Sequence, residues 1–132
     1  MSDDGNAGGS WADARCTPSR KGTPLLDADA RARLGRELPE WRVGASTTGS
    51  TPDEVLARTY RFERYADAAA FVAEVAALAE SEDHHPATLL TYDAVVVELR
   101  THAAGGLTRN DAVLAAKIER TAARARGLRR GR

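Results

Sequence analysis

Residues 80–102 read ESEDHHPATLLTYDAVVVELRTH, and this stretch decides the fold. It begins where a helical pattern ends, and it continues as two strand-like runs, Leu89–Thr91 and Ala94–Arg100. Pro86 separates the helix from the strands, because proline lacks an amide hydrogen and restricts the residue before it. Apolar side chains alternate along the second run, as they do in a strand with one buried face. The stretch therefore predicts a helix, a sharp turn and a pair of strands.

Related patterns lie on both sides of this stretch. Upstream, Phe71, Val75 and Leu78 form the apolar stripe of a helix over Ala66–Glu80. The remaining predicted elements are a helix that Asp27 caps and Pro39 ends, strands at Trp41–Val43 and Val55–Phe62, a loop at Gly44–Pro52, and a helix at Thr108–Arg124. The order helix, strand, strand, helix, strand, strand, helix predicts an α+β fold, with a four-stranded antiparallel sheet and three helices packed on one face.

The chain of 132 residues has the length of one domain, and its two ends differ in composition from the middle. Residues 1–22 are rich in Gly, Ser, Asp and Ala and lack a hydrophobic period, so we expect a disordered leader. Trp11 is the one residue of the leader that is suited to docking. Residues 125–132 form a basic tail, which we expect to be a solvated end. The predicted domain spans residues 23–124.

Charge and composition exclude several classes of function. The 19 basic and 19 acidic residues give a formal net charge of zero, so no nucleic-acid or acidic lipid partner is expected. No apolar run is long enough to span a membrane, and the N-terminus lacks the basic and apolar pattern of a secretory signal. Cys16 is the only cysteine, so no disulfide forms within the chain, which fits a reducing compartment. We therefore expect a cytoplasmic protein.

All three histidines of the chain, His84, His85 and His102, lie in the stretch quoted above. Imidazole is the side chain whose ordinary pKa lies nearest to neutral pH, so it both gives and takes a proton there. If the two strands form a hairpin, His102 returns to the end of the sheet where the other two histidines lie. Three imidazoles beside carboxylates would then form a proton-transfer site. The candidate carboxylates are Glu80, Glu82, Asp83 and Asp111.

Each of these residues also has a simpler interpretation. A single histidine on a loop is usually exposed or hydrogen-bonded, and Glu80 and Glu82 suit the solvated end of a helix. Asp111 lies at capping-box spacing from Thr108, which is typical of a helix cap. Histidine and acid are also ligands for zinc or iron, but adjacent residues on one turn point apart and no cysteine pair is present. We therefore predict that the site holds no metal.

The same residues resemble the pterin-4a-carbinolamine dehydratase family, also called the 4a-hydroxytetrahydrobiopterin dehydratases. The family pattern is an acid, His-His-Pro after three residues, an aromatic residue, Thr-His, a Gly-rich turn and an Asp. Its counterparts in this chain are Glu80, His84-His85-Pro86, Tyr92, Thr101-His102, Gly105-Gly106-Leu107-Thr108 and Asp111. The resemblance covers residues 24–122. Thr88 and Ala104 depart from it, since many relatives have Trp at the first position and some have Cys at the second.

The resemblance implies an activity and a set of site residues. The family removes water from the 4a-hydroxytetrahydrobiopterin that an aromatic amino acid hydroxylase forms, and the quinonoid dihydropterin that results returns to tetrahydrobiopterin. This reaction requires no metal, nucleophile or redox cofactor. The resemblance gives acid and base roles to His84, His85 and His102. It gives supporting or substrate-binding roles to Glu80, Asp83, Pro86, Tyr92, Thr101 and Asp111.

The resemblance also implies a homo-oligomer, either a dimer or a tetramer. Members of the family serve as dimerisation partners of transcription factors or assist the assembly of other enzymes. A non-catalytic dimerisation or assembly module of the same fold is therefore the second hypothesis. The histidines discriminate between the two, because a pure scaffold need not retain all of them. This chain has all three, which favours the lyase.

Overall fold

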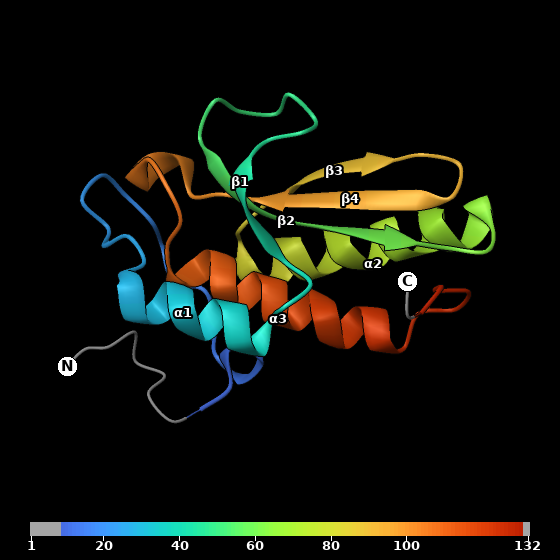
Figure 1. Cartoon of the computed structure of the whole chain (residues 1–132), viewed down its shortest axis with the longest axis horizontal. Coiled ribbons are helices and arrows are strands. Elements are labelled where there is room, and N and C mark those ends of the chain that lie inside the picture. Colours follow the sequence, from blue (N-terminus) through green and yellow to red (C-terminus); the bar gives the residue numbers. More distant parts are fainter. Residues whose placement is uncertain (1–8, 131–132) are drawn as a thin grey trace.

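The computed structural model describes residues 9–130, which form a four-stranded sheet covered by three α-helices (Figure 1). The strand order is β1-β2-β4-β3, and every neighbouring pair is antiparallel. In chain order the elements are the 3-10 helix η1 (Trp11–Asp13), α1 (Ala28–Glu37), β1 (Arg42–Ala45), β2 (Glu54–Arg61), α2 (Tyr65–Glu82), β3 (Ala87–Leu90), β4 (Ala94–Leu99), the 3-10 helix η2 (His102–Ala104) and α3 (Arg109–Ala123). Within this described range, no helix has both the length and the apolar character needed to cross a membrane.

All three α-helices lie on one face of the sheet, so the predicted α+β architecture is confirmed (Figure 1). In β4 the side chains of Val95, Val97 and Leu99 are fully buried in the core beneath these helices. Each such side chain contributes about 1.5–3 kcal/mol relative to an exposed one. Tyr60 of β2 and Phe71 of α2 pack edge to face in the same core, with ring centroids 4.9 Å apart. The alternation of side chains along a strand thus selects the face that the helices cover.

Capping side chains set where two of the helices begin. Asp27 accepts a hydrogen bond of 2.9 Å from the amide of Ala30 at the start of α1. Thr108 and Asp111 form a capping box at the start of α3, in which each side chain accepts a hydrogen bond from a backbone amide. Caps of this kind satisfy amides that have no partner within the helix. Both helix starts agree with the spacing of these residues in the sequence.

The end of α2 is a left-handed turn. Asp83 has φ of 53°, a conformation that costs roughly 1–2 kcal/mol for a residue other than glycine. The amide of His84 donates to the carbonyl of Ala79 at 3.2 Å and closes the last turn of the helix. Pro86 follows and leads into β3. This turn leaves His84 buried and His85 exposed.

The N-terminal segment is packed against the core in its described part, residues 9–22, which corrects the expectation of a disordered leader. Trp11 is only 1% exposed and belongs to the hydrophobic core. Arg33 of α1 stacks over the Trp11 ring at 3.9 Å from its centroid, and η1 packs against α3. Burial of one large aromatic side chain, on the order of 3 kcal/mol, offsets the entropy lost by a few ordered residues. Residues 1–8 of the predicted leader lie outside the described residues.

The basic tail is also attached to the domain in its described part, residues 125–130, and is not the solvated end that composition predicts. Leu128 forms an antiparallel bridge with Phe62, just beyond the end of β2. The amide of Glu63 donates to the carbonyl of Gly127 at 2.8 Å. Gly127 permits this turn, because its φ is 76° and a Cβ at this position would collide with the carboxylate of Asp67.

Candidate active site

His84 is the buried histidine of the chain, and its ring contacts Asp111. The side chain is 10% exposed, and its Nε2 lies 2.7 Å from Oδ1 of Asp111. Asp111 itself is fully buried in the first turn of α3. The turn after α2 therefore places His84 in contact with the start of α3, which lies 27 residues later in the chain.

Asp111 is held by a buried network of hydrogen bonds. Its Oδ2 accepts from the Thr101 hydroxyl at 2.8 Å and from the Thr108 amide at 2.9 Å. The two threonine hydroxyls are also bonded to each other at 2.7 Å, and both residues are buried. Leaving one of these groups without a partner would cost about 1–3 kcal/mol. Asp111 is thus both the helix cap that its spacing indicates and the partner of a histidine.

The hydrogen bond to Asp111 determines which nitrogen of His84 is available. We assign the hydrogen of this pair to Nε2, because a carboxylate only accepts. Nδ1 is then the ring nitrogen that can exchange a proton with a bound molecule. The bond also fixes the orientation of the ring, as carboxylates do beside other proton-transferring imidazoles.

His85 has a different environment on the surface of the same turn. Its side chain is 56% exposed, and its Nε2 lies 3.3 Å from Oε1 of Glu80, a side chain that is 78% exposed. Water screens a pair of this kind, so its contribution to stability is small. The structure therefore brings Glu80 to His85, while His84 receives its carboxylate from α3.

His102 lies at the same end of the sheet as the other two histidines. The β3–β4 hairpin is present as predicted, and Ala87 pairs with Glu98, so the start of β3 lies beside the end of β4. The side chain of His102 is 82% exposed, and its Nδ1 lies 3.9 Å from Oδ2 of Asp53. Asp53 was not a predicted site residue, since it precedes β2 in a polar loop without a recognisable motif.

The remaining predicted residues are distributed around the hairpin. Asp83 forms the exposed end of α2, and Pro86 connects the histidines to β3. Thr101 belongs to the Asp111 network. Tyr92 is 78% exposed in the turn between β3 and β4, at the opposite end of the hairpin from the histidines. Within the single chain, the structure does not bring Tyr92 to the histidines.

Glu82 turns away from the histidines, although the sequence groups it with them. Its carboxylate accepts a hydrogen bond of 2.8 Å from the Cys16 amide, and it lies 3.1 Å from Arg15 and 3.5 Å from Lys117. Burial opposes ionisation of this carboxyl, but the amide and the two cations outweigh burial and hold the pKa of Glu82 below its usual value. Composition assigns residues 15 and 16 to a disordered leader, so no sequence signal reveals this contact.

The chemistry that these groups offer is proton transfer. Each imidazole has its own carboxylate, in the pairs His84–Asp111, His85–Glu80 and His102–Asp53. Among residues 9–130, no three His, Cys, Asp or Glu side chains are arranged to hold a metal ion. Burial, followed by the negative charges of Glu82 and Asp111, raises the pKa of the Cys16 thiol to about 12, so this thiol is a poor nucleophile.

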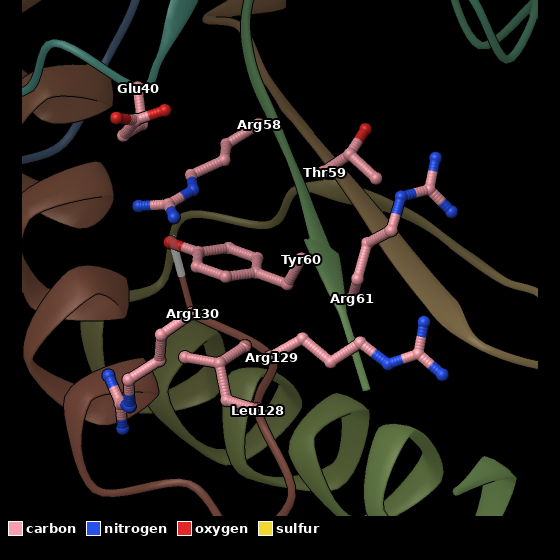
Figure 2. A pocket seen from close by; sticks show the side chains of 8 residues that line it. All are labelled: Glu40, Arg58, Thr59, Tyr60, Arg61, Leu128, Arg129 and Arg130. Carbon is pink, nitrogen blue, oxygen red and sulfur yellow. The ribbon is translucent and has the colours of Figure 1, made fainter. Parts of the chain in front are cut away.

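A hollow of about 560 Å³ lies elsewhere, between β2 and the C-terminal tail (Figure 2). Its lining residues are Glu40, Arg58, Thr59, Tyr60, Arg61, Leu128, Arg129 and Arg130. This is the far end of β2 from the histidines, because Arg61 pairs with Ala94 whereas Leu56 pairs with Leu99. The four arginines have acceptors within the chain, namely Glu119, Asp93, Glu63 and the carbonyl of Ala123. We therefore place the candidate site at the histidines.

Comparison with known proteins gives close sequence relatives. The sequence model of the family described as "Pterin 4 alpha carbinolamine dehydratase" matches residues 23–121. Two curated relatives bear the name "Putative pterin-4-alpha-carbinolamine dehydratase". The relative from Syntrophotalea carbinolica is 41% identical over 106 residues, which are 79% of this chain and 89% of the relative. The relative from Stenotrophomonas maltophilia is 42% identical over 107 residues, which are 80% of this chain and 86% of the relative.

A solved structure has the same fold. The crystal structure of a "transcriptional coactivator/pterin dehydratase" from Brucella melitensis matches with a TM-score of 0.64 and 28% sequence identity, and the match covers 74% of this chain and 98% of that chain. The range that matches the family contains the three histidines, Asp111 and Thr101. The resemblance drawn from the sequence is thereby confirmed, and the chain belongs to the pterin 4 alpha carbinolamine dehydratase family.

Proposed function

We propose that the protein is a lyase that dehydrates 4a-hydroxytetrahydrobiopterin to the quinonoid dihydropterin by histidine acid–base catalysis. The observation that carries this proposal is the hydrogen bond of 2.7 Å between His84 and the buried Asp111. Membership of the family supplies the class of substrate. The product would return to tetrahydrobiopterin, which links the activity to an aromatic amino acid hydroxylase.

The reaction consists of two proton transfers and one bond cleavage. The bond between C4a and its hydroxyl oxygen breaks as this oxygen gains a proton and leaves as water. The neighbouring ring nitrogen loses its proton, and the electron pair forms the carbon–nitrogen double bond of the product. An imidazolium supplies the first proton and a neutral imidazole accepts the second, so one acid and one base near neutral pH are sufficient.

The three histidines would share these two roles. Asp111 binds Nε2 and holds the His84 ring in one orientation, so Nδ1 would be the nitrogen that exchanges a proton with the pterin. His85 and His102 are exposed, and their carboxylate partners are at the surface or only partly buried, so these two rings are able to turn toward a bound pterin. One fixed and two adjustable imidazoles fit a reaction in which one group must give a proton while another takes one.

The alternative function is a non-catalytic dimerisation or assembly module. The name of the Brucella melitensis protein includes both a coactivator and a dehydratase, so the two functions occur together in that name. The buried His84–Asp111 pair favours the lyase. Burying two polar groups is unfavourable, and a protein that only binds a partner does not require such a pair.

The direct test is an assay of the purified full-length chain with the 4a-carbinolamine generated in the cuvette. After subtraction of the uncatalysed dehydration, the proposal predicts that product formation rises in proportion to protein concentration. A second measurement follows turnover of a coupled aromatic amino acid hydroxylase, which should increase when the protein is added. Pterin binding without acceleration would support the assembly module, and an absence of both would exclude a pterin function.

A further inference from the structure

Residues 10–19, which we call the N-terminal strap, lie before the range that matches the family and pack across α3 and the end of α2. Trp11 anchors the strap in the core. Lys117 of α3 donates to the carbonyl of Ala12 at 3.0 Å, and Arg109 donates to the carbonyl of Arg15 at 3.0 Å. These contacts run along the helix that carries Asp111.

The first anchor point of the strap is Glu82, the last residue of α2. Its side chain is only 5% exposed, and its carboxylate binds the amide of Cys16 at 2.8 Å and the Nε of Arg15 at 3.1 Å. A buried carboxylate without these partners would be costly, so the strap and the helix end are held together. Glu82 lies two residues before His84, and it therefore fixes the turn from which the His84 ring projects.

The second anchor point is Asn110, which immediately precedes Asp111 in α3. Its Oδ1 accepts from the Thr17 amide at 2.9 Å, and its Nδ2 donates to the Thr17 carbonyl at 2.6 Å and to the Ser19 hydroxyl at 2.9 Å. Asn110 is 4% exposed, so its side of these three hydrogen bonds is shielded from water. The strap thus pairs with the side chain next to the carboxylate that holds His84.

We infer that the N-terminal strap is a positioning element for the His84–Asp111 hydrogen bond, and that Glu82 and Asn110 are the positioning residues through which it acts. One anchor fixes the backbone beside His84 and the other fixes the backbone beside Asp111, so the strap sets the distance between the two partners. A proton-transfer group that is displaced by up to about 1 Å lowers the rate of the catalysed reaction by roughly 10- to 100-fold. The catalytic part of this inference rests on the proposed function, whereas the structural part does not.

The test uses full-length variants and two readouts. Asn110→Ala removes the three hydrogen bonds to the strap, and Glu82→Ala removes the other anchor. Glu82→Gln keeps an acceptor for the Cys16 amide and tests rescue by a conservative change. The matched control is Asp13→Ala, which removes a strap contact with Arg120 that is exposed on both sides and includes neither anchor residue.

The first readout is the exchange with water of the Nε2 hydrogen of His84, followed by NMR without substrate. In the wild-type protein and in Asp13→Ala this hydrogen should be protected, because it is bonded to a buried carboxylate. In Asn110→Ala and Glu82→Ala its exchange should rise at least about tenfold, and Glu82→Gln should restore most of the protection. The second readout is dehydration, for which the alanine variants should lose about tenfold in kcat with little change in KM.

Unchanged protection of His84 in both alanine variants would overturn the inference. If either variant does not fold, Ser19→Ala serves in its place, because it removes one hydrogen bond between the strap and Asn110 and leaves both anchor side chains in the protein. Absence of dehydration by the wild-type protein would count against the proposed function alone, since the exchange of the His84 hydrogen is measured without pterin. If the His84 hydrogen loses protection but kcat is unchanged, the strap positions His84 but this position does not affect catalysis. That outcome would reject the catalytic part of the inference and keep the structural part.

Discussion

His84 and Asp111 share the hydrogen bond on which the proposed chemistry depends, although 27 residues separate them in the chain. The sequence pattern selects both, His84 as part of a histidine pair and Asp111 by its spacing from Thr108. It does not pair them, because a capping box is a local pattern whereas the direction of His84 depends on the left-handed Asp83 and on how α2 packs against α3. The same limit applies to Asp53, which lies just before β2 and reaches His102 because β2 pairs with β4.

Burial of His84 changes what its removal should do to stability. Histidines in a proton-transfer cleft are expected to be exposed, so that substitution affects activity but not folding. The His84 side chain is 10% exposed and bonded to a fully buried carboxylate. His84→Ala would leave one oxygen of Asp111 without this partner, which should cost about 1–3 kcal/mol of unfolding free energy. His85→Ala, at an exposed position, should leave the unfolding free energy within about 0.5 kcal/mol of wild type. Urea unfolding of the two variants and the wild-type protein measures both differences.

Thr101→Val tests the network that holds Asp111. The change removes the hydroxyl that donates to Asp111 and pairs with Thr108, while the shape of the side chain is kept. We expect a loss of about 1–2 kcal/mol in the free energy of unfolding and a lower kcat. Thr59→Val, at an exposed position in β2 away from the histidines, is the matched control and should change neither quantity. Equal stability and kcat in the two variants would mean that Thr101 does not hold Asp111 in place.

At the scale of elements, one carboxylate ties a loop to the sheet. Glu98 of β4 is 1% exposed, and it accepts hydrogen bonds from the Ser46 hydroxyl at 2.6 Å and the Thr47 amide at 2.8 Å. Hydroxyls of Thr48 and Ser50 also donate to it, each at 2.9 Å, and the Thr47 hydroxyl does so at 3.3 Å. Figure 1 shows this loop between β1 and β2, on the side of the sheet away from the helices. Burial opposes ionisation of Glu98, but these hydrogen bonds outweigh it and lower its pKa to about 2.

The lowered pKa makes a prediction about acid stability. A carboxyl whose pKa falls on folding stabilises the folded state above its unfolded pKa of about 4.5, and this contribution disappears as the pH falls toward 2. Glu98 should therefore contribute about 3 kcal/mol at pH 7. Urea unfolding of Glu98→Gln should give a lower free energy at pH 7 and a smaller decrease than wild type between pH 4.5 and pH 2. Glu74→Gln, an exposed change in α2, is the control, and identical pH curves for both variants would refute this role of Glu98.

Periodicity predicts the helices and strands because neighbours in the chain determine them. Periodicity fails where contacts between residues that are distant in the sequence determine the local structure. β1 begins after Trp41 rather than at it, because the Trp41 amide donates to the Leu38 carbonyl at 3.0 Å in a turn and the pairing with β2 starts at Arg42. Composition likewise assigns the N-terminal strap to a disordered leader, since its order depends on partners in α2 and α3. Glycine, serine and threonine between residues 44 and 52 predict a loop but not the buried carboxylate of Glu98 that holds it.

At the scale of the whole molecule, the sheet has two edge strands, β1 and β3. An unpaired edge is a template for another strand, and Leu89 of β3 and Val43 of β1 are 44% and 40% exposed. We predict a homodimer or homotetramer closed by twofold symmetry. Sedimentation of the full-length protein should show this multimer, and Leu89→Lys or Val43→Lys should weaken it according to which edge is used. A monomer at micromolar concentration would contradict the prediction.

A further prediction for the whole molecule concerns metal ions. Proton transfer by imidazoles requires no metal, so dialysis against a strong chelator should leave both the dehydration rate and Tm unchanged. A metal that belonged to the structure would contribute to folding, and its removal would lower Tm. Stoichiometric zinc by elemental analysis, together with activity lost on chelation and restored by zinc, would replace the acid–base account with a metal-dependent one.

The central claim is that the histidines move the protons of the dehydration, and the rates of single histidine variants test it most directly. The measurement is kcat for His84→Ala, His85→Ala and His102→Ala with the 4a-carbinolamine, below the Tm of each variant and after subtraction of the uncatalysed rate. Arg36→Ala, at an exposed position of α1, is the control and should retain the wild-type rate. We predict that loss of His84 or His85 lowers kcat by roughly 10²-fold or more and that loss of His102 also impairs it. Wild-type rates in both the His84 and the His85 variants would contradict the account.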